Sequence, residues 1–390
     1  MQNQIWLEID LQAIAHNCRQ VRSFIPADTS FMAVVKANAY GHGDIQVART
    51  VLQNGADCLA VARLQEGIRL RQAGITAPIL VFGPVSLEDI PQLLEHDLML
   101  TLYDADLASN ISKKAEYLGT RIKGHIKIDT GMGRLGLNSL PEDKSSQTYD
   151  YSALQNVIRL ATLPGLEIKG LFTHFAQADN PDKSYTLEQL HRFLHFATDL
   201  KFQDINIPLL HAANSAATID LPESHLGMVR PGIMLYGFYP TPHQNKTILD
   251  LIPAMTFKTR IIQIKDVPAG FRVSYGSTYT TTAPTRLATL SVGYADGYPR
   301  ILSSRGEMLI RGRRVPVVGR VCMDQTVVDI GRTEDIQPGE EVTIFGKQGD
   351  VLLPVEEIAD ACSTIHYEIV SSIPGRVPRI YYPQEEDQSS

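Results

Sequence analysis

The sequence predicts an α/β fold in which a (βα)8 TIM-like barrel is followed by a mostly antiparallel β domain. The first observation is that short apolar runs alternate with helix-periodic segments over about 230 residues, which indicates parallel strands joined by helices. The second is a change in amino-acid composition after Gly237, where a polar, proline-bearing connector begins. The third is the series of β-rich runs beyond that connector. At this length a closed barrel is favoured over an open doubly wound sheet.

The first helix is expected over residues 11–21, where apolar side chains recur at helical spacing and Asp10 can cap the amino end. The apolar run FMAVV, residues 31–35, is read as the next strand. Residues 154–161 and 187–197 repeat the helical pattern. Further barrel strands are expected in the runs HIKID, GLFTHF, IPLLHA and MVRPGIMLYG.

The connector FYPTPHQNK separates these elements from runs rich in β-branched residues and bounded by turn residues. Strands are expected in MTFKTRIIQI, RLATLSVGY, RRVPVVGRV and QTVVDI. The predicted domains are therefore a barrel over residues 8–239 and a β domain over residues 240–390, with residues 1–7 available to pair onto the second domain.

The composition favours a small-molecule ligand. Of the 390 residues, 44% are hydrophobic and 20% charged, and the formal net charge of −7 argues against a nucleic-acid or anionic-membrane partner. No signal peptide and no membrane span of about 18 apolar residues is visible, so we expect a soluble, cytoplasmic protein. The widely scattered cysteines favour reduced thiols over disulfides or a metal site. They are Cys18, Cys58, Cys322 and Cys362.

Polar residues at the ends of the apolar runs are the candidates for chemistry, because the carboxyl ends of barrel strands face the active site. Each of them alone has a structural explanation as a hydrogen-bonded group near a strand end. Their convergence at one end of a barrel favours a functional site. These residues are Lys36, Arg134, His174, Ser215 and Arg230.

Lys36 is the candidate nucleophile. Partial burial and nearby cations disfavour the ammonium form, so the pKa of such a lysine falls from about 10.4 and the neutral amine can attack a carbonyl. A phosphorylated aldehyde cofactor would also need an anion cradle. Backbone N–H groups of Gly232 and Ile233, with the hydroxyls of Ser215 and Tyr40, could form that cradle, although any glycine-bearing βα loop would qualify.

The ordered motifs of the chain resemble those of the alanine racemase family, which are pyridoxal 5'-phosphate enzymes. The resemblance runs from IWLEID to RVPRIY and rests on VVKANAYGHG, DTGMGRLG, THFA, HAANSAA, MVRPGIMLYG, VSYGSTY, SVGYADGYPR, GRVCMDQTVVD and RVPR. It implies a barrel followed by a β domain, and a head-to-tail homodimer whose active sites are shared. It also implies interconversion of L-alanine and D-alanine through a pyridoxal-phosphate aldimine, supplying D-alanine for peptidoglycan.

The resemblance also implies a role for each candidate in the barrel. Lys36 would carry the cofactor, and Arg230 would lie against the pyridine nitrogen, with His174 in the same cofactor site. Arg134 would face the phenolic oxygen of the cofactor and the substrate carboxylate. The phosphate would be bound by Tyr40, Ser215, Gly232 and Ile233.

By the same resemblance, racemisation uses two bases, Lys36 on one face of the substrate and Tyr275 of the partner subunit on the other. Because an ordinary tyrosine has a pKa of about 10, nearby donors such as His174 and Arg230 would have to favour the phenolate. Met323 would come from the partner subunit with Tyr275. Tyr294 would line the path by which the substrate reaches the site.

Two positions affect modification and substrate range. Many members of the family carry a carbamylated lysine where this chain has Lys127, and a negative group there would pair with Arg134, whereas an unmodified lysine would repel it. Many relatives also have a tyrosine before RVPR, where this chain has Gly375. The missing aromatic ring favours a wider substrate range.

Three alternatives compete with an alanine-specific racemase. The nearest is a racemase of broader or serine-directed specificity, for which Gly375 is the motivation. A pyridoxal-phosphate carrier protein shares the barrel and the lysine but lacks a β domain. The β-rich runs predicted within residues 241–390 therefore argue against this alternative. A basic amino-acid decarboxylase pairs barrel and β domain, yet the chain reads VCMDQ and contains no Cys-Glu-Ser signature.

Overall fold

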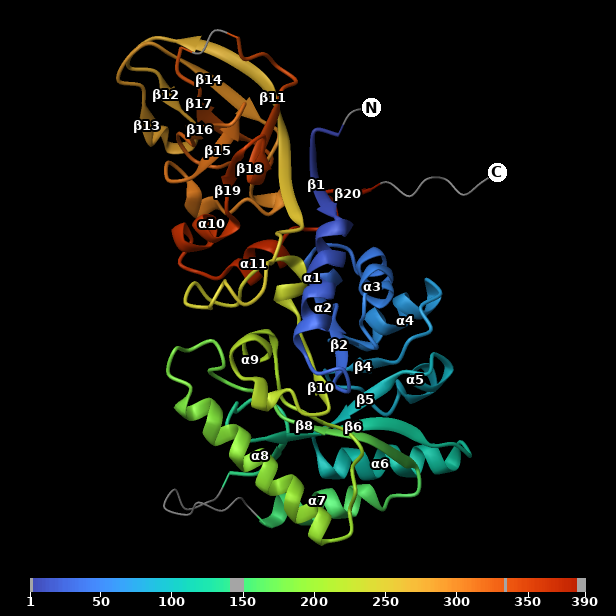
Figure 1. Cartoon of the computed structure of the whole chain (residues 1–390). Coiled ribbons are helices and arrows are strands. Elements are labelled where there is room, and N and C mark those ends of the chain that lie inside the picture. The colour runs from blue at the N-terminus through green and yellow to red at the C-terminus, as the bar shows by residue number, and fades with distance from the viewer. Residues whose placement is uncertain (1–2, 141–150, 333–334, 384–390) are drawn as a thin grey trace. The chain divides into compact units, whose positions relative to one another are not determined.

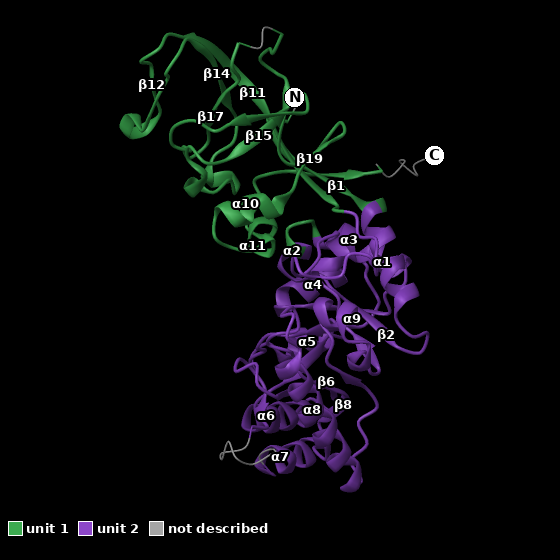
Figure 2. Cartoon of the chain, turned by 60° about the vertical axis from the view of Figure 1, so that its left-hand side comes forward, with its two compact units in different colours: residues 1–12, 40–43, 253–390 green, residues 13–39, 44–252 purple. Residues whose placement is uncertain are grey.

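The computed structural model describes residues 3–140, 151–332 and 335–383. It divides into two compact units, coloured separately in Figure 2. One unit, called the barrel unit below, comprises residues 13–39 and 44–252. The other, called the β unit, combines residues 1–12, 40–43 and 253–390.

The strand pairings of the barrel unit form a closed ring of eight parallel strands, as the sequence predicted. Most of these strands are labelled in Figure 1. Neighbours along the ring are hydrogen-bonded in the order given below, and β10 pairs with β2 to close it, with Met228 opposite Ser30. A further short strand, β7 (Leu137–Asn138), pairs with the carboxyl end of β6. The ring consists of β2 (Ser30–Val34), β3 (Cys58–Val61), β4 (Ile79–Val81), β5 (Met99–Leu102), β6 (Ile122–Asp129), β8 (Leu166–Phe172), β9 (Leu210–His211) and β10 (Met228–Val229).

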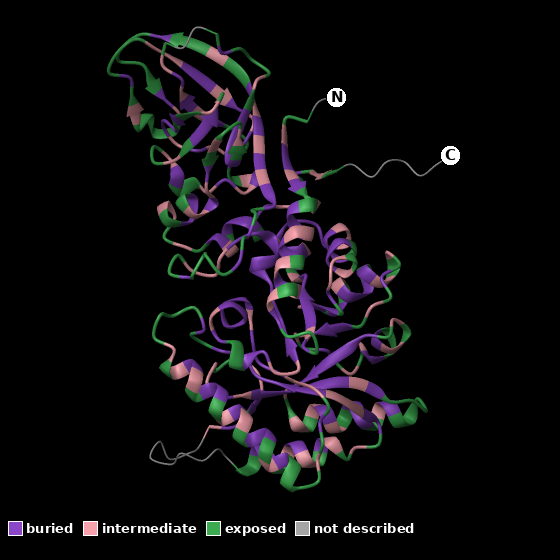
Figure 3. Ribbon diagram, viewed as in Figure 1, coloured by how far each residue is buried: buried purple, intermediate pink, exposed green. Residues whose placement is uncertain are grey.

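Helices flank the strands of the ring, and all of them except the almost wholly buried helix Ser215–Asp220 bury one face and expose the other (Figure 3). The helical segments predicted at 11–21, 154–161 and 187–197 are confirmed as α1, α7 and α8. Asp10 caps α1 as predicted, because its Oδ1 accepts a hydrogen bond from the Gln12 N–H at 2.8 Å. The helices are α1 (Leu11–Phe24), α3 (Asp44–Gln53), α4 (Leu64–Gln72), α5 (Ile90–Glu95), α6 (Ala105–Tyr117), α7 (Tyr151–Ala161), α8 (Ser184–Phe202) and α9 (Ser215–Asp220).

The β unit is built on a mostly antiparallel sheet with the strand order β16-β15-β18-β11-β1-β20. Its first strand, β1 (Ile5–Asp10), pairs antiparallel with β11 (Met255–Val267) and parallel with β20 (Arg379–Tyr382). The remaining strands are β12 (Arg272–Val273), β13 (Tyr279–Thr280), β14 (Thr285–Leu290), β15 (Glu307–Ile310), β16 (Arg313–Pro316), β17 (Thr326–Asp329), β18 (Glu341–Gln348) and β19 (Val351–Leu353). Two helices follow, α10 (Val355–Ala361) and α11 (His366–Ser371).

Two properties of the residues that the structure describes bear on the classes of partner. No helix among them is long and apolar enough to cross a membrane. Within the same ranges, no group of three or more His, Cys, Asp or Glu side chains is arranged to hold a metal ion.

Candidate active site

Lys36 follows the carboxyl end of β2 and starts a left-handed turn, the segment Lys36–Tyr40 labelled α2 in Figure 1. Residues 37–40 all have positive φ, between 51° and 54°. Left-handed backbone costs about 1–2 kcal/mol per residue for amino acids other than glycine, so this turn needs support. Glu66 supplies part of it, because its Oε1 accepts the Ala37 N–H at 2.7 Å. Asn38 Oδ1 accepts the N–H of Asp44 at 3.1 Å.

Glu66 also fixes the start of α4. Its Oε2 accepts the backbone N–H groups of Ala62 at 2.7 Å and Arg63 at 3.0 Å. One carboxylate therefore joins the loop after β3 to the turn that carries Lys36. The pKa of Lys36 is lowered by burial first and then by Arg134, while the charge of Glu66 acts in the opposite direction. The lowered pKa raises the fraction of neutral amine, the form that a nucleophile or base requires.

Four cations gather at the carboxyl end of the barrel: Lys36, Lys127, Arg134 and Arg230. The pKa of Lys127 is lowered to about 8, by burial first and then by Arg134, Arg230 and Lys36, against the charge of Asp129. Lys127 Nζ and the Arg230 guanidinium carbon lie 5.5 and 5.3 Å from the ring centroid of Phe172. A cluster of like charges of this kind is an environment for anionic ligands.

The loop that carries Arg134 is organised by Asp129, the last residue of β6. Its Oδ1 accepts the three successive N–H groups of residues 131–133 at 2.9, 2.9 and 3.1 Å. Tyr185 on α8 donates its hydroxyl to the carbonyl of Gly131 at 2.9 Å. The DTGMGRLG motif therefore forms a fixed turn, which places Arg134 beside the two lysines.

Arg230 is buried at the end of β10, and its guanidinium donates to four acceptors. Nη1 donates to His211 Nδ1 at 2.9 Å. Nη2 donates to the carbonyls of Thr173 and Ala212 at 2.8 and 2.9 Å, and to His174 Nδ1 at 3.4 Å. Burial lowers the pKa of Arg230, but these acceptors hold the cation in place.

The bond from Arg230 sets the tautomer of His174. A guanidinium only donates, so His174 Nδ1 accepts and the ring proton lies on Nε2. Burial and the neighbouring cations hold the pKa of His174 well below its ordinary value, so the ring is neutral. Its Nε2–H is therefore a neutral hydrogen-bond donor at the cationic end of the barrel.

One backbone N–H expected in the predicted anion cradle already has a partner within the protein. The Gly232 N–H, expected to be offered to the ligand, donates to Ser215 Oγ at 2.8 Å. Because Oγ accepts this bond, the Ser215 hydroxyl keeps its own proton for another acceptor. Asn214 caps α9 through a 3.0 Å bond from the Ala217 N–H, which fixes the serine at the start of that helix. Ile233 begins the short helix Ile233–Tyr236.

The other predicted residues belong to the β unit. Tyr40 packs beside Tyr367, with ring centroids 6.2 Å apart. Tyr275 is 73% exposed and begins a turn between β12 and β13. That turn is anchored by Ser274, whose hydroxyl donates to the Arg320 carbonyl at 2.6 Å. A tyrosine on a fixed turn with its side chain exposed is available to a second molecule.

Tyr294 and Met323 lie on two joined loops of the β unit. The Tyr294 N–H donates to the Cys322 carbonyl at 3.0 Å, and Tyr294 and Met323 are 41% and 54% exposed. Arg376 links both loops to the RVPR motif, because its Nη2 lies 2.8 Å from Oδ1 of Asp296 and 2.8 Å from Oδ1 of Asp324.

Gly375 precedes Arg376 in the same loop cluster. A Cβ atom added to Gly375 would meet no other atom within 4 Å. The position therefore has open space where an aromatic side chain could be accommodated.

Sequence reasoning missed three residues that organise these groups: Glu66, His211 and Arg376. His211 lay within the predicted strand IPLLHA, whose end faces the site, so its position was available from the sequence. Glu66 stands five residues after the end of β3, and only the fold shows that it reaches the turn after β2. Arg376 belongs to the RVPR motif, but its two carboxylate partners lie more than 50 residues earlier in the chain.

The fold and the cationic strand ends define a class of protein: a barrel enzyme for small anionic molecules, accompanied by a β unit. Comparison with known families narrows the class. Residues 9–240 match the family model for the alanine racemase N-terminal domain, and residues 254–381 match the model for the C-terminal domain.

Curated relatives and solved structures agree with the family models. An alanine racemase of Methanococcus maripaludis is 48% identical over 97% of this chain and 98% of its own length. Alanine racemase of Clostridium difficile 630 superposes with a TM-score of 0.90 at 40% identity, covering 98% of this chain and 96% of the other. The alanine racemase of Bacillus anthracis with bound L-Ala-P superposes with a TM-score of 0.90 at 38% identity, covering 99% of this chain and 97% of the other. The chain belongs to the alanine racemase family.

Proposed function

We propose that this enzyme interconverts L-alanine and D-alanine, using pyridoxal 5'-phosphate held in the barrel over residues 8–239. Residues 240–390 contribute to active sites shared within a homodimer, and the D-alanine serves peptidoglycan synthesis. The observation that carries the proposal is the cluster of Lys36, Lys127, Arg134 and Arg230 at the strand ends, in a chain of this family.

The donor set fits a phosphorylated aldehyde. Lys36 has a lowered pKa, as an amine that condenses with an aldehyde needs. The Ser215 hydroxyl and the Ile233 N–H, with Tyr40, are the donors for the phosphate, and Gly232 holds Ser215 in place through the bond to Oγ. When bound, pyridoxal phosphate supplies an electron sink that acidifies the hydrogen on the substrate α-carbon.

Arg230 is the residue proposed to lie against the pyridine nitrogen. Its bonds to His211, Thr173 and Ala212 fix its orientation before any ligand arrives. A guanidinium there would donate a hydrogen bond without giving up its proton, so Arg230 would leave the ring nitrogen unprotonated. Arg230 would thereby withdraw less electron density than an acidic partner that protonates the ring, which would disfavour transamination.

Proton transfer requires one group on each face of the substrate α-carbon. The Lys36 amine takes or returns the proton on one face, and Tyr275, supplied by the other subunit, acts on the opposite face. The Nε2–H of His174 and the charge of Arg230 favour the phenolate form of an incoming tyrosine. Met323 accompanies Tyr275 from the same subunit, and Tyr294 lines the substrate path.

Arg134 is proposed to bind the substrate carboxylate, with Lys127 carbamylated beside it. Carbon dioxide reacts with a neutral amine, releasing a proton, and a pKa of about 8 gives Lys127 a neutral fraction near physiological pH. The carbamate would convert a repelling neighbour of Arg134 into a charge-assisted hydrogen-bond acceptor.

Gly375 supports a second candidate, a racemase that also accepts serine, because the space around its α-carbon is open. The test is to load purified protein with pyridoxal phosphate and measure formation of the opposite enantiomer from a panel of L-amino acids. Racemisation of alanine is expected, with serine as the next best substrate. Failure to racemise alanine by the cofactor-loaded protein would contradict the proposal.

A further inference from the structure

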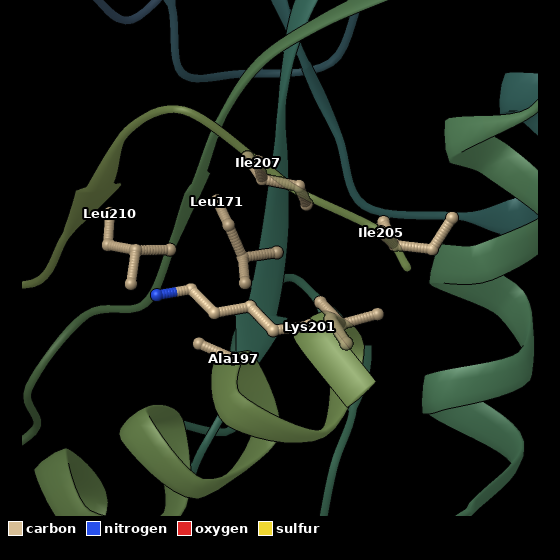
Figure 4. Close-up of a pocket in the computed structure, with 7 residues that line it drawn as sticks. Leu171, Ala197, Lys201, Ile205, Ile207 and Leu210 are labelled. Carbon is tan, nitrogen blue, oxygen red and sulfur yellow. The ribbon is translucent and has the colours of Figure 1, made fainter. Parts of the chain in front are cut away.

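Two cavities of the barrel unit differ in what they can hold. The smaller one lies beside α8 and is lined by apolar side chains and the stem of Lys201 (Figure 4). Its volume is about 10 Å³, enough for one water molecule at most. The larger cavity has a volume of about 420 Å³, which lies within the range of small-molecule sites.

The larger cavity opens at the amino-terminal end of the barrel, the end opposite the proposed active site. Cys58, Met99 and Met228, which are the first residues of β3, β5 and β10, line it. Lys36, in contrast, lies two residues beyond the last residue of β2. The cavity, called the amino-end cavity below, is therefore separate from the site that the family motifs define.

The inner wall of the amino-end cavity is apolar and polarisable. Met32, Cys58, Met99 and Met228 line it and are all buried. Methionine side chains adapt to apolar groups of different shape because they are unbranched. His125, which is 2% exposed, is the polar side chain among them.

The rim carries balanced charge. Lys123 and Lys169 are opposed by Asp57 and Asp97 among the lining residues. Lys123 Nζ lies 2.8 Å from Asp97 Oδ1, and Lys169 Nζ is paired with Glu167 Oε1. Asp57 Oδ2 accepts the Phe31 N–H at 2.7 Å and lies 3.6 Å from Arg22 Nη1. These contacts leave donors on the ammonium groups and acceptors on the carboxylates, a pattern that suits a zwitterion better than an ion of either sign.

The hydrogen bonds of His125 determine what it offers to the cavity. Arg230 donates to His211 Nδ1, so a neutral His211 carries its proton on Nε2 and donates to His125 Nδ1 at 2.8 Å. The proton of His125 is then on Nε2, and no hydrogen bond within the described ranges engages that atom. The pKa values of both rings are lowered by burial, in agreement with neutral imidazoles.

We propose that the amino-end cavity is a second ligand site, which binds a free α-amino acid with an apolar side chain. The ligand carboxylate accepts from His125 Nε2–H and from Lys169, and its ammonium group faces Asp57 and Asp97. The ligand side chain lies against the methionines. The bound amino acid would extend the hydrogen-bond chain that runs from Arg230 through His211 to His125. Binding in the amino-end cavity does not require racemase activity.

The test is a titration of cofactor-loaded protein, labelled with 13C at the methionine methyl groups, with L-leucine as the probe. We expect saturable shifts of the Met32, Met99 and Met228 signals, each assigned by a Met→Leu variant. Met323 in the β unit reports any binding at the proposed active site. The fragments 4-methylpentanoate and 3-methylbutylamine, which each lack one charge of leucine, should bind at least tenfold more weakly.

The variant Lys169→Gln should weaken leucine binding about tenfold, because a charge-assisted bond is lost. Lys113→Gln, on the exposed side of α6, is the matched control and should leave binding unchanged. Shifts confined to Met323, or equal affinity in the two variants, would overturn the proposal. Equal affinity for 4-methylpentanoate and leucine would also overturn it, since the zwitterion would then have no role.

Discussion

The left-handed turn after Lys36 should depend on Glu66, and Glu66→Gln tests that dependence. The carboxylate accepts three backbone N–H groups, those of Ala37, Ala62 and Arg63. A glutamine in either orientation places its amide nitrogen against at least one of these donors. Loss of one bond to a charged acceptor is worth about 1.5–3 kcal/mol.

The loss of this hydrogen bond affects a segment whose left-handed backbone is already unfavourable in free energy. Four left-handed residues at about 1–2 kcal/mol each amount to about 4–8 kcal/mol, which the surrounding contacts must offset. A decrease of about 1.5–3 kcal/mol in the free energy of unfolding corresponds to a fall in Tm of about 3–12 °C for a unit of this size. The pKa of Lys36 should also fall further, because Glu66 is the group that raises it.

The assay combines thermal unfolding with the pH dependence of cofactor incorporation. Glu66→Gln should lower Tm by that amount and move the acid limb of incorporation to lower pH. Glu116→Gln is the matched control, because Glu116 accepts one side-chain bond, from Ser112 at 2.9 Å, and it should change Tm by less than about 2 °C. Equal Tm values and identical pH profiles for the two variants would refute the support assigned to Glu66.

Three further predictions concern modification, substrate range and the shared site. Activity should fall as pH drops below the pKa of Lys127, about 8, because protonation of the amine opposes carbamylation. Added bicarbonate should restore the activity. A density map with an unmodified lysine beside Arg134 would contradict the predicted carbamylation. Gly375→Tyr should fold normally and lower the serine-to-alanine rate ratio at least tenfold, whereas an unchanged ratio means that another residue limits the space. Lys36→Ala and Tyr275→Ala should each be nearly inactive, and co-refolding equal amounts should restore about a quarter of wild-type sites, since half the dimers are mixed and each has one intact site. No recovery despite subunit exchange would remove Tyr275 from the shared site.

The architecture could be predicted from the sequence because its signals are local and repeated. Apolar runs alternating with helical periodicity give a parallel barrel, and Asp10 could be identified as a cap from its place before an apolar helical face. The strand-end rule then placed Lys36, Arg134 and Arg230 at one end of the ring without any knowledge of distances.

The parts that escaped prediction depend on contacts between distant segments. The left-handed turn at residues 37–40 follows from bonds to Glu66 and Asp44 rather than from local propensity, since alanine disfavours that conformation. The use of the Gly232 N–H by Ser215 depends on the relative positions of α9 and β10. His125 shares a face of β6 with Lys127 by two-residue alternation, but its bond to His211 requires the closed barrel.

Lys36 is the residue proposed to hold pyridoxal phosphate. Borohydride reduction of the cofactor-loaded protein, followed by digestion and mass spectrometry, locates the modified lysine directly. We expect one reduced cofactor per chain, on the peptide containing Lys36, and none on the Lys36→Ala protein. Full labelling of the Lys36→Ala protein through a different lysine would show that Lys36 is not the cofactor-binding residue.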